Sequence, residues 1–150
     1  MSRLLGEKKV GRFSILFDVA NYSDVAKARE GSLAPDQVRR VTIRGVVDSG
    51  AARFVLPKAV VQQLGLPITS KVKVRYADGR TATRPQAEGA HVQILGRNGI
   101  FHAIVVPKRE SALIGAIILE DLDLLVDCAH LRLVPRDPRF VVSEIESSSL

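Results

Sequence analysis

The chain has 150 residues, of which 46% are hydrophobic and 25% charged, with one cysteine and no tryptophan. This length favours one domain with its own core, and a single cysteine excludes an internal disulfide, so we expect a cytoplasmic protein in a reducing compartment. The net charge of +6 is spread along the chain without interleaved aromatic residues, and no apolar run is long enough for a membrane span, which disfavours nucleic acid and membranes as partners.

The first half of the chain shows strand patterns around one polar segment. Residues 12–20 are apolar enough for a strand, and 38–47 alternate and then become continuously apolar, as a strand entering a core does. Between them, residues 21–37 are polar and predict a loop with a helical turn. A short strand over 52–56 follows.

A helix and two hairpins are predicted next. Residues 57–65 predict a helix, because a proline begins the segment and a glycine ends it. Residues 71–85 predict a hairpin around the Asp-Gly pair at 78–79. Residues 90–106 repeat this pattern, with the turn expected at the Asn-Gly pair 98–99.

The last elements complete a mostly β pattern. Residues 112–127 are apolar and then predict a short helix, and 130–135 alternate as a final strand. About eight short strands with one or two short helices indicate a small closed or folded-over β-barrel. We expect a single domain over residues 1–150, with its core at about 12–135 and a polar tail at 136–150.

Asp48 is the acidic residue that packing explains least. It follows a core strand, precedes Ser49 and Gly50, and has apolar sequence on both sides. A buried carboxylate is costly unless something pairs with it or uses it, although an Asx-type turn would also account for this position. The other acidic residues have ordinary predicted roles, as solvated charges or turn caps: Asp78, Glu120, Asp121 and Asp123 for the first, Asp18 and Asp127 for the second.

Metal and thiol chemistry have little support. The histidines His91, His102 and His130 lack the spacing of metal ligands, and we expect no metal and no cofactor. Cys128 lies two residues before His130, which does not give a working nucleophile–base geometry on a strand. We therefore interpret Cys128 as a buried structural thiol.

Three short motifs carry a resemblance to a known family. They are Asp48-Ser49-Gly50-Ala51, Leu113-Ile114-Gly115 and Tyr76-Ala77-Asp78-Gly79-Arg80. The first resembles the Asp-Thr/Ser-Gly-Ala signature of the retropepsin-like aspartic proteases, and the second is similar to their hydrophobic-hydrophobic-Gly motif. The third lies where the family keeps its flap. The resemblance extends over roughly residues 12–135 and is nearest to the small bacterial and archaeal members.

The resemblance implies a closed β-barrel of retropepsin-like (acid protease) type and a homodimeric aspartic endopeptidase that acts on a peptide or protein substrate. Because the chain carries one signature, a working pair needs Asp48 from each of two chains, sharing one proton. Ser49 would bond to the partner chain, Gly50 would allow close backbone approach, and Gly115 with its neighbours would hold the catalytic loop. The hairpin would close over substrate.

The resemblance leaves several points open. Ala52 and Ala116 stand where retroviral enzymes commonly place an acid and an arginine that pair, and no counterpart of their C-terminal interface strand follows Val134. Arg53 adds a cation near the signature. A catalytically weak or inactive dimer that binds peptides or proteins remains an alternative, as does a basic barrel that binds nucleic acid. Residues expected to line the substrate pocket are Val74, Tyr76, Ile104 and Ile114.

Overall fold

The computed structural model describes residues 12–146 of the chain. Within these residues, nine β-strands, three α-helices and one 3-10 helix follow one another. The strands are β1 (Arg12–Asn21), β2 (Arg40–Asp48), β3 (Phe54–Pro57), β4 (Ile68–Arg75), β5 (Thr81–Ile94), β6 (Arg97–Val106), β7 (Ala112–Ile114), β8 (Leu124–Asp127) and β9 (Arg132–Pro135). The helices are α2 (Tyr22–Glu30), η1 (Pro35–Gln37), α3 (Lys58–Leu64) and α4 (Ala116–Asp121).

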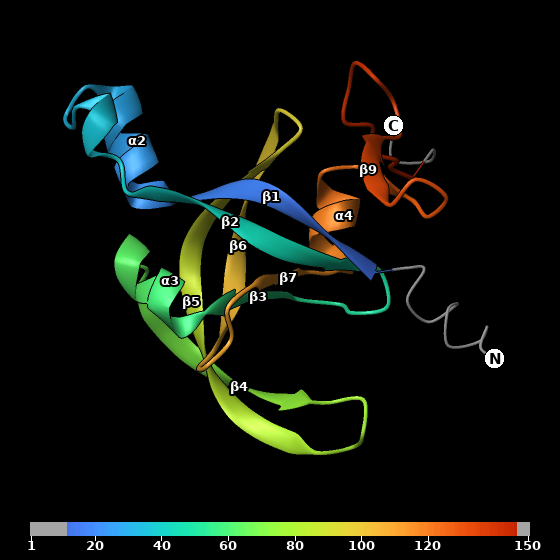
Figure 1. Ribbon diagram of the computed structural model, residues 1–150. Coiled ribbons are helices and arrows are strands. Elements are labelled where there is room, and N and C mark those ends of the chain that lie inside the picture. Colours follow the sequence, from blue (N-terminus) through green and yellow to red (C-terminus); the bar gives the residue numbers. More distant parts are fainter. Residues whose placement is uncertain (1–11, 147–150) are drawn as a thin grey trace.

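Six of the described strands close into a barrel (Figure 1). The order in the large sheet is β1-β2-β7-β3-β6-β5-β4, and a further pairing of β1 with β5 joins its two sides. β4 pairs with β5 alone, so this hairpin projects beyond the barrel, while β8 and β9 form a separate sheet. The predicted mostly β closed barrel is confirmed, with three α-helices in the described residues rather than one or two. None of these helices is long and apolar enough to cross a membrane.

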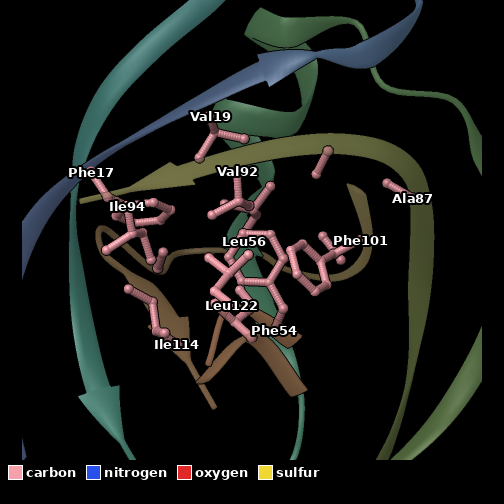
Figure 2. Packing of buried hydrophobic residues seen from close by; sticks show 14 of the residues in the cluster. Phe17, Val19, Phe54, Leu56, Ala87, Val92, Ile94, Phe101, Ile114 and Leu122 are labelled. Carbon is pink, nitrogen blue, oxygen red and sulfur yellow. The ribbon is translucent and has the colours of Figure 1, made fainter. Parts of the chain in front are cut away.

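Alternating side chains of the barrel strands fill its interior (Figure 2). Phe54 of β3 lies at the centre, with edge-to-face ring contacts to Phe17 and Phe101 at centroid distances of 6.3 Å each. Each fully buried large apolar side chain contributes about 1.5–3 kcal/mol to folding. Val47, immediately before Asp48, is fully buried, so the strand that ends at Asp48 is fixed in the core.

Helix α2 replaces the predicted loop at the start of segment 21–37. The Asn21 side chain caps the helix, because its Oδ1 accepts a hydrogen bond from the Asp24 backbone amide at 3.0 Å, and its Nδ2 donates to the Leu64 carbonyl at 2.9 Å. The Asp24 carboxylate is buried and accepts a hydrogen bond from Nε of Arg39 at 2.8 Å. Sequence periodicity missed this helix because Asp24 is its only buried residue, so the helix has no apolar stripe to recognise.

The hairpin between β5 and β6 turns earlier than predicted. Ile94 pairs with Arg97, so the turn residues are Leu95 and Gly96, both with positive φ (53° and 79°). The predicted Asn-Gly turn at 98–99 lies within β6. The register that buries the apolar residues of β5 and β6 fixes the turn, and it overrides the local preference of Asn-Gly.

Hydrogen bonds attach the C-terminal segment to β6 and to the connection between α4 and β8. Asp123, predicted to be solvated, is buried and accepts Nε of Arg136 at 2.7 Å and the Val142 amide at 2.9 Å. Arg97 of β6 donates to the carbonyls of Asp137 and Phe140. The part of the predicted tail that follows 146 lies outside the described residues.

Two further predictions on single residues are wrong. Cys128 is exposed rather than a buried thiol, because it lies in the turn between β8 and β9. Asp18 lies within β1 rather than at its end, and it accepts a hydrogen bond from the Thr42 hydroxyl on β2. Asp127 does cap its turn, since it accepts the His130 amide at 3.2 Å.

Candidate active site

Asp48 is the last residue of β2, at the point where the strand leaves the core. Its side chain is 26% exposed, and the following residues Ser49 and Gly50 are exposed. The Gly50 amide donates to Oδ1 of Asp48 at 3.0 Å, and the Ala51 amide donates to the Asp48 carbonyl at 3.1 Å. The Asx-type turn is therefore present, and it leaves the carboxylate partly exposed to solvent.

Arg12 forms an ion pair with the Asp48 carboxylate. The antiparallel register of β1 and β2 places Arg12 opposite Asp48, with 3.4 Å between Nε and Oδ2. The Arg12 side chain is 55% exposed, so the pair is partly solvated and its contribution to stability is small. Sequence reasoning missed this residue, because only the strand register brings the two together.

β7 lies between the two strands that flank the Asp48 loop. Ile114 pairs with Val47 of β2 in parallel and with Phe54 of β3 in antiparallel orientation. The residue that follows, Gly115, therefore meets the loop directly. A side chain at Gly115 would have its Cβ 2.7 Å from the Ala51 carbonyl oxygen and would also collide with Arg53.

The first turn of α4 completes the support of this loop. The Ala116 amide donates to the Ala51 carbonyl at 2.8 Å, and the Ile117 amide donates to the Ala52 carbonyl at 3.0 Å. The opening amides of a helix have no partners within the helix, so they are free to bind the loop. The structure thus brings the two predicted motifs, 48–51 and 113–115, into direct contact through backbone groups.

The predicted flap is the tip of the β4–β5 hairpin. The Tyr76 amide donates to the Arg80 carbonyl at 2.8 Å, and Gly79 adopts a φ of 90° in the turn. Asp78 accepts both the Arg80 amide and Nε of Arg80, at 2.9 and 2.7 Å, and these bonds lower the pKa of Asp78. The Arg80 guanidinium also lies 5.1 Å from the centre of the Tyr76 ring. Ala77 is exposed in this turn.

The hairpin and the Asp48 loop project from the same side of the barrel (Figure 1). Nη2 of Arg53 in the loop donates to Oε1 of Gln86 in β5 at 3.2 Å, and Gln86 in turn donates to Ser70 of β4 at 3.3 Å. Nearer the tip, Nη2 of Arg84 donates to the Tyr76 hydroxyl at 3.1 Å. The hairpin is therefore tied to the loop at its base and internally braced toward its tip.

Two of the four residues expected to line a substrate pocket are buried in this chain, so their side chains do not face a pocket. Ile114 is fully buried and Ile104 is 6% exposed, because both point into or against the barrel core. Val74 and Tyr76 on the hairpin are half-buried. A cavity of about 400 Å³ lies elsewhere, between α3, the first residues of β4 and the middle of β5, and neither the Asp48 loop nor the hairpin tip lines it.

Arg109, in the β6–β7 connection, is a half-buried cation outside the predicted motifs. Its Nε donates to the Ser111 carbonyl at 2.6 Å, just before β7 begins. Burial lowers the pKa of Arg109, and the positive charge of Arg12 lowers it further, while Tyr76 acts in the opposite direction. The charge of Arg12, which pairs with Asp48, therefore acts on Arg109 as well. No sequence motif marked it.

A closed barrel with an acid-bearing loop packed against a glycine, and a hairpin on the same side, is the arrangement of the retropepsin-like aspartyl protease fold. A family model described as "gag-polyprotein putative aspartyl protease" matches residues 36–121, which include the Asp48 loop, the hairpin and Gly115. The chain belongs to this aspartyl protease family, and the predicted family resemblance is confirmed.

Solved structures of related type were also found. The chain is similar to the retroviral protease-like domain of Ddi1 from Leishmania major, with 20% identity and a TM-score of 0.46 over 65% of this chain and 81% of that one. It is also similar to the EIAV protease complexed with the inhibitor HBY-793, with 20% identity and a TM-score of 0.44 over 54% of this chain and 77% of that one. No curated protein matches the sequence.

Proposed function

We propose that the protein is a homodimeric aspartic endopeptidase that cuts peptide bonds with Asp48 from each of two chains. The observation that supports this proposal most directly is the partly exposed Asp48 carboxylate, at the end of a core strand and on a loop that Gly115 and α4 hold in place. Each chain supplies one such acid within residues 12–146, so a pair requires a two-fold dimer.

The chemistry follows from two carboxylates at close range. Like charges about 3 Å apart do not both ionise, so the pair holds one proton. The ionised Asp48 takes a proton from a water molecule, whose oxygen bonds to the scissile carbonyl carbon, while the protonated Asp48 donates to the carbonyl oxygen. Collapse of this intermediate breaks the C–N bond, and the leaving nitrogen takes up a proton. The hairpin residues Tyr76–Arg80 would hold the peptide and exclude water.

A protein that binds peptides without cutting them is the second candidate. One observation favours it: Arg12 forms an ion pair with the Asp48 carboxylate, and this cation would have to move before two such carboxylates could share a proton. In that case peptides would bind and be recovered intact.

Cleavage of a peptide library at mildly acidic pH separates the two candidates. We expect new termini with wild type and none with Asp48→Asn, which keeps the side-chain shape but cannot act as the base. Asp36→Asn is the matched control, because Asp36 is exposed on η1 and outside the site. Binding without cleavage would favour the second candidate, and cleavage that survives Asp48→Asn would remove the proposed chemistry.

A further inference from the structure

The surroundings of Asp48 carry more positive charge than the site itself neutralises. Arg12 at the start of β1 pairs with Asp48, Arg53 lies in the same loop, and Arg109 before β7 is subject to the charge of Arg12. Arg12 pairs with Asp48, but within residues 12–146 no carboxylate forms an ion pair with Arg53 or Arg109.

The contacts of Arg53 and Arg109 hold them in place without neutralising them. Arg53 donates to the neutral Gln86 side chain at 3.2 Å, and Arg109 donates to backbone carbonyls of Ser111 and Ala112 at 2.6 and 3.4 Å. Arg109 is half-buried, so its charge is less screened by water than that of a fully exposed arginine. Guanidinium groups that have no carboxylate partner among residues 12–146 favour a carboxylate ligand, since their planar forks match its geometry.

The hairpin opposite does not supply the missing negative charge. Asp78 at its tip is already bound by the Arg80 amide and guanidinium. Along β4, the exposed residues Lys71, Lys73 and Arg75 are all basic. These three side chains lie on the face of β4 opposite to Ser70 and Gln86, through which the hairpin is tied to the loop. A peptide held between the hairpin and the loop would therefore meet cations from the loop side.

We propose that this site selects peptides with Asp or Glu close to the scissile bond, and that Arg12, Arg53 and Arg109 determine this preference. The inference rests on the proposed peptidase function and names its substrate class. In the dimer, two sets of these arginines would surround an acid pair with one net negative charge, so an acidic substrate side chain would lower the remaining positive charge of the cleft. An oligonucleotide is a less suitable occupant, because Tyr76 is the one aromatic side chain of the described hairpin tip on which a base could stack.

The test uses synthetic peptides that carry a sequence cut by wild type and differ by a single Glu-to-Gln replacement near the scissile bond. We expect kcat/KM to be about tenfold higher for the Glu peptide, equivalent to ~1.4 kcal/mol, and the ratio to shrink as salt is added. Arg109→Gln should reduce the ratio to about twofold, whereas Arg109→Lys should retain most of it. Arg29→Gln on α2, at the far end of β1 from Arg12, should leave the ratio unchanged.

Two further measurements keep this proposal separate from the proposed function. Affinities of the same peptide pair for Asp48→Asn, measured by fluorescence anisotropy, test the charge preference even if no peptide is cut. Equal affinities and equal kcat/KM values for Glu and Gln peptides would overturn the preference while leaving the peptidase intact. A single-stranded oligonucleotide that binds more tightly than the Glu peptide, and displaces it, would also overturn it. If Arg109→Gln lowers the melting temperature, Arg12→Gln and Arg53→Gln provide the same test.

Discussion

At the scale of single residues, Gly115 decides where the Asp48 loop can lie. The residue has an ordinary negative φ of −100°, so its importance comes from space rather than from backbone strain. Its neighbours are backbone atoms of Ala51 and Arg53, which cannot rotate away as a flexible side chain would. The loop and α4 are thus packed with no room for a methyl group, and the position of Asp48 depends on that contact.

We predict that Gly115→Ala lowers both stability and peptidase activity. The added Cβ would lie 2.7 Å from the Ala51 carbonyl oxygen, so the loop or α4 must shift. Overpacking of this kind costs ~1–3 kcal/mol of unfolding free energy. Chemical denaturation measures the loss, with Gly50→Ala as control, because a Cβ there has its closest contact at 3.4 Å from the Asp48 side chain. Equal unfolding free energies for the two variants would contradict the prediction, because they would show that the loop shifts at no cost in stability.

Leu95 is a residue that the fold holds in an unfavourable conformation. It is 57% exposed and has a φ of 53° in the two-residue turn before Gly96. Left-handed backbone costs a non-glycine residue roughly 1–2 kcal/mol, and asparagine tolerates it better than leucine. We predict that Leu95→Asn raises the unfolding free energy by about 1 kcal/mol. Leu131→Asn is the comparison variant, because Leu131 has a similar φ of 51° but does not lie in a two-residue hairpin turn. A melting temperature below wild type for Leu95→Asn would contradict the turn assignment.

At the scale of elements, α2 and α3 are joined by polar groups rather than by an apolar face. Asn21 donates to the last turn of α3, and Arg39 lies over Gly65, the left-handed cap of that helix. Arg39 also donates to both oxygens of Asp24, at 2.8 and 3.1 Å. A side chain at Gly65 would displace the end of the flexible Arg39 side chain, but the φ of 67° is the stronger reason for glycine at this position.

The Asp24–Arg39 pair predicts a specific dependence of stability on pH. Hydrogen bonds from Arg39 lower the pKa of Asp24 from its ordinary value of 3.8 to about 2. Because the folded pKa is the lower one, the stabilisation is fully present above the ordinary value and is lost as the pH falls toward about 2. We expect wild type to exceed Asp24→Asn by about 2 kcal/mol near neutral pH, with the difference vanishing in that acid range. Denaturation curves across it measure this, and Asp36→Asn should follow wild type throughout.

The same elements show what the sequence could and could not predict. Strong strand patterns and the Pro- and Gly-bounded α3 were predictable, because burial alternates along each strand and the caps are local signals. Helix α2 was not, since it is held by Asn21 and Asp24 through contacts with residues far along the chain. In the candidate site, the two motifs that meet at the Asp48 loop could be found by their residues, whereas Arg12 and Arg109 required the strand register and the path of the β6–β7 connection.

At the scale of the whole molecule, the barrel offers only half of the proposed catalytic pair. β1 pairs with β5 only over Asp18–Asn21, so its other end and Asp48 lie at an edge of the barrel that is not closed by further pairing in the described residues. The hairpin of β4 and β5 extends on that side (Figure 1). A second chain placed there would complete the acid pair and provide a second hairpin.

We predict that activity in mixtures of wild type and Asp48→Asn falls with the square of the wild-type fraction. If each active unit needs one Asp48 from each chain, an equal mixture assembled by co-refolding keeps about one quarter of the activity of the same total amount of wild type. Independent sites would keep about one half, since each wild-type chain would work alone. Dilution with Asp36→Asn controls for handling and should keep activity unchanged. A linear decline with Asp48→Asn, together with a sedimentation coefficient of a monomer at working concentration, would place all the catalytic groups within one chain and remove the shared pair.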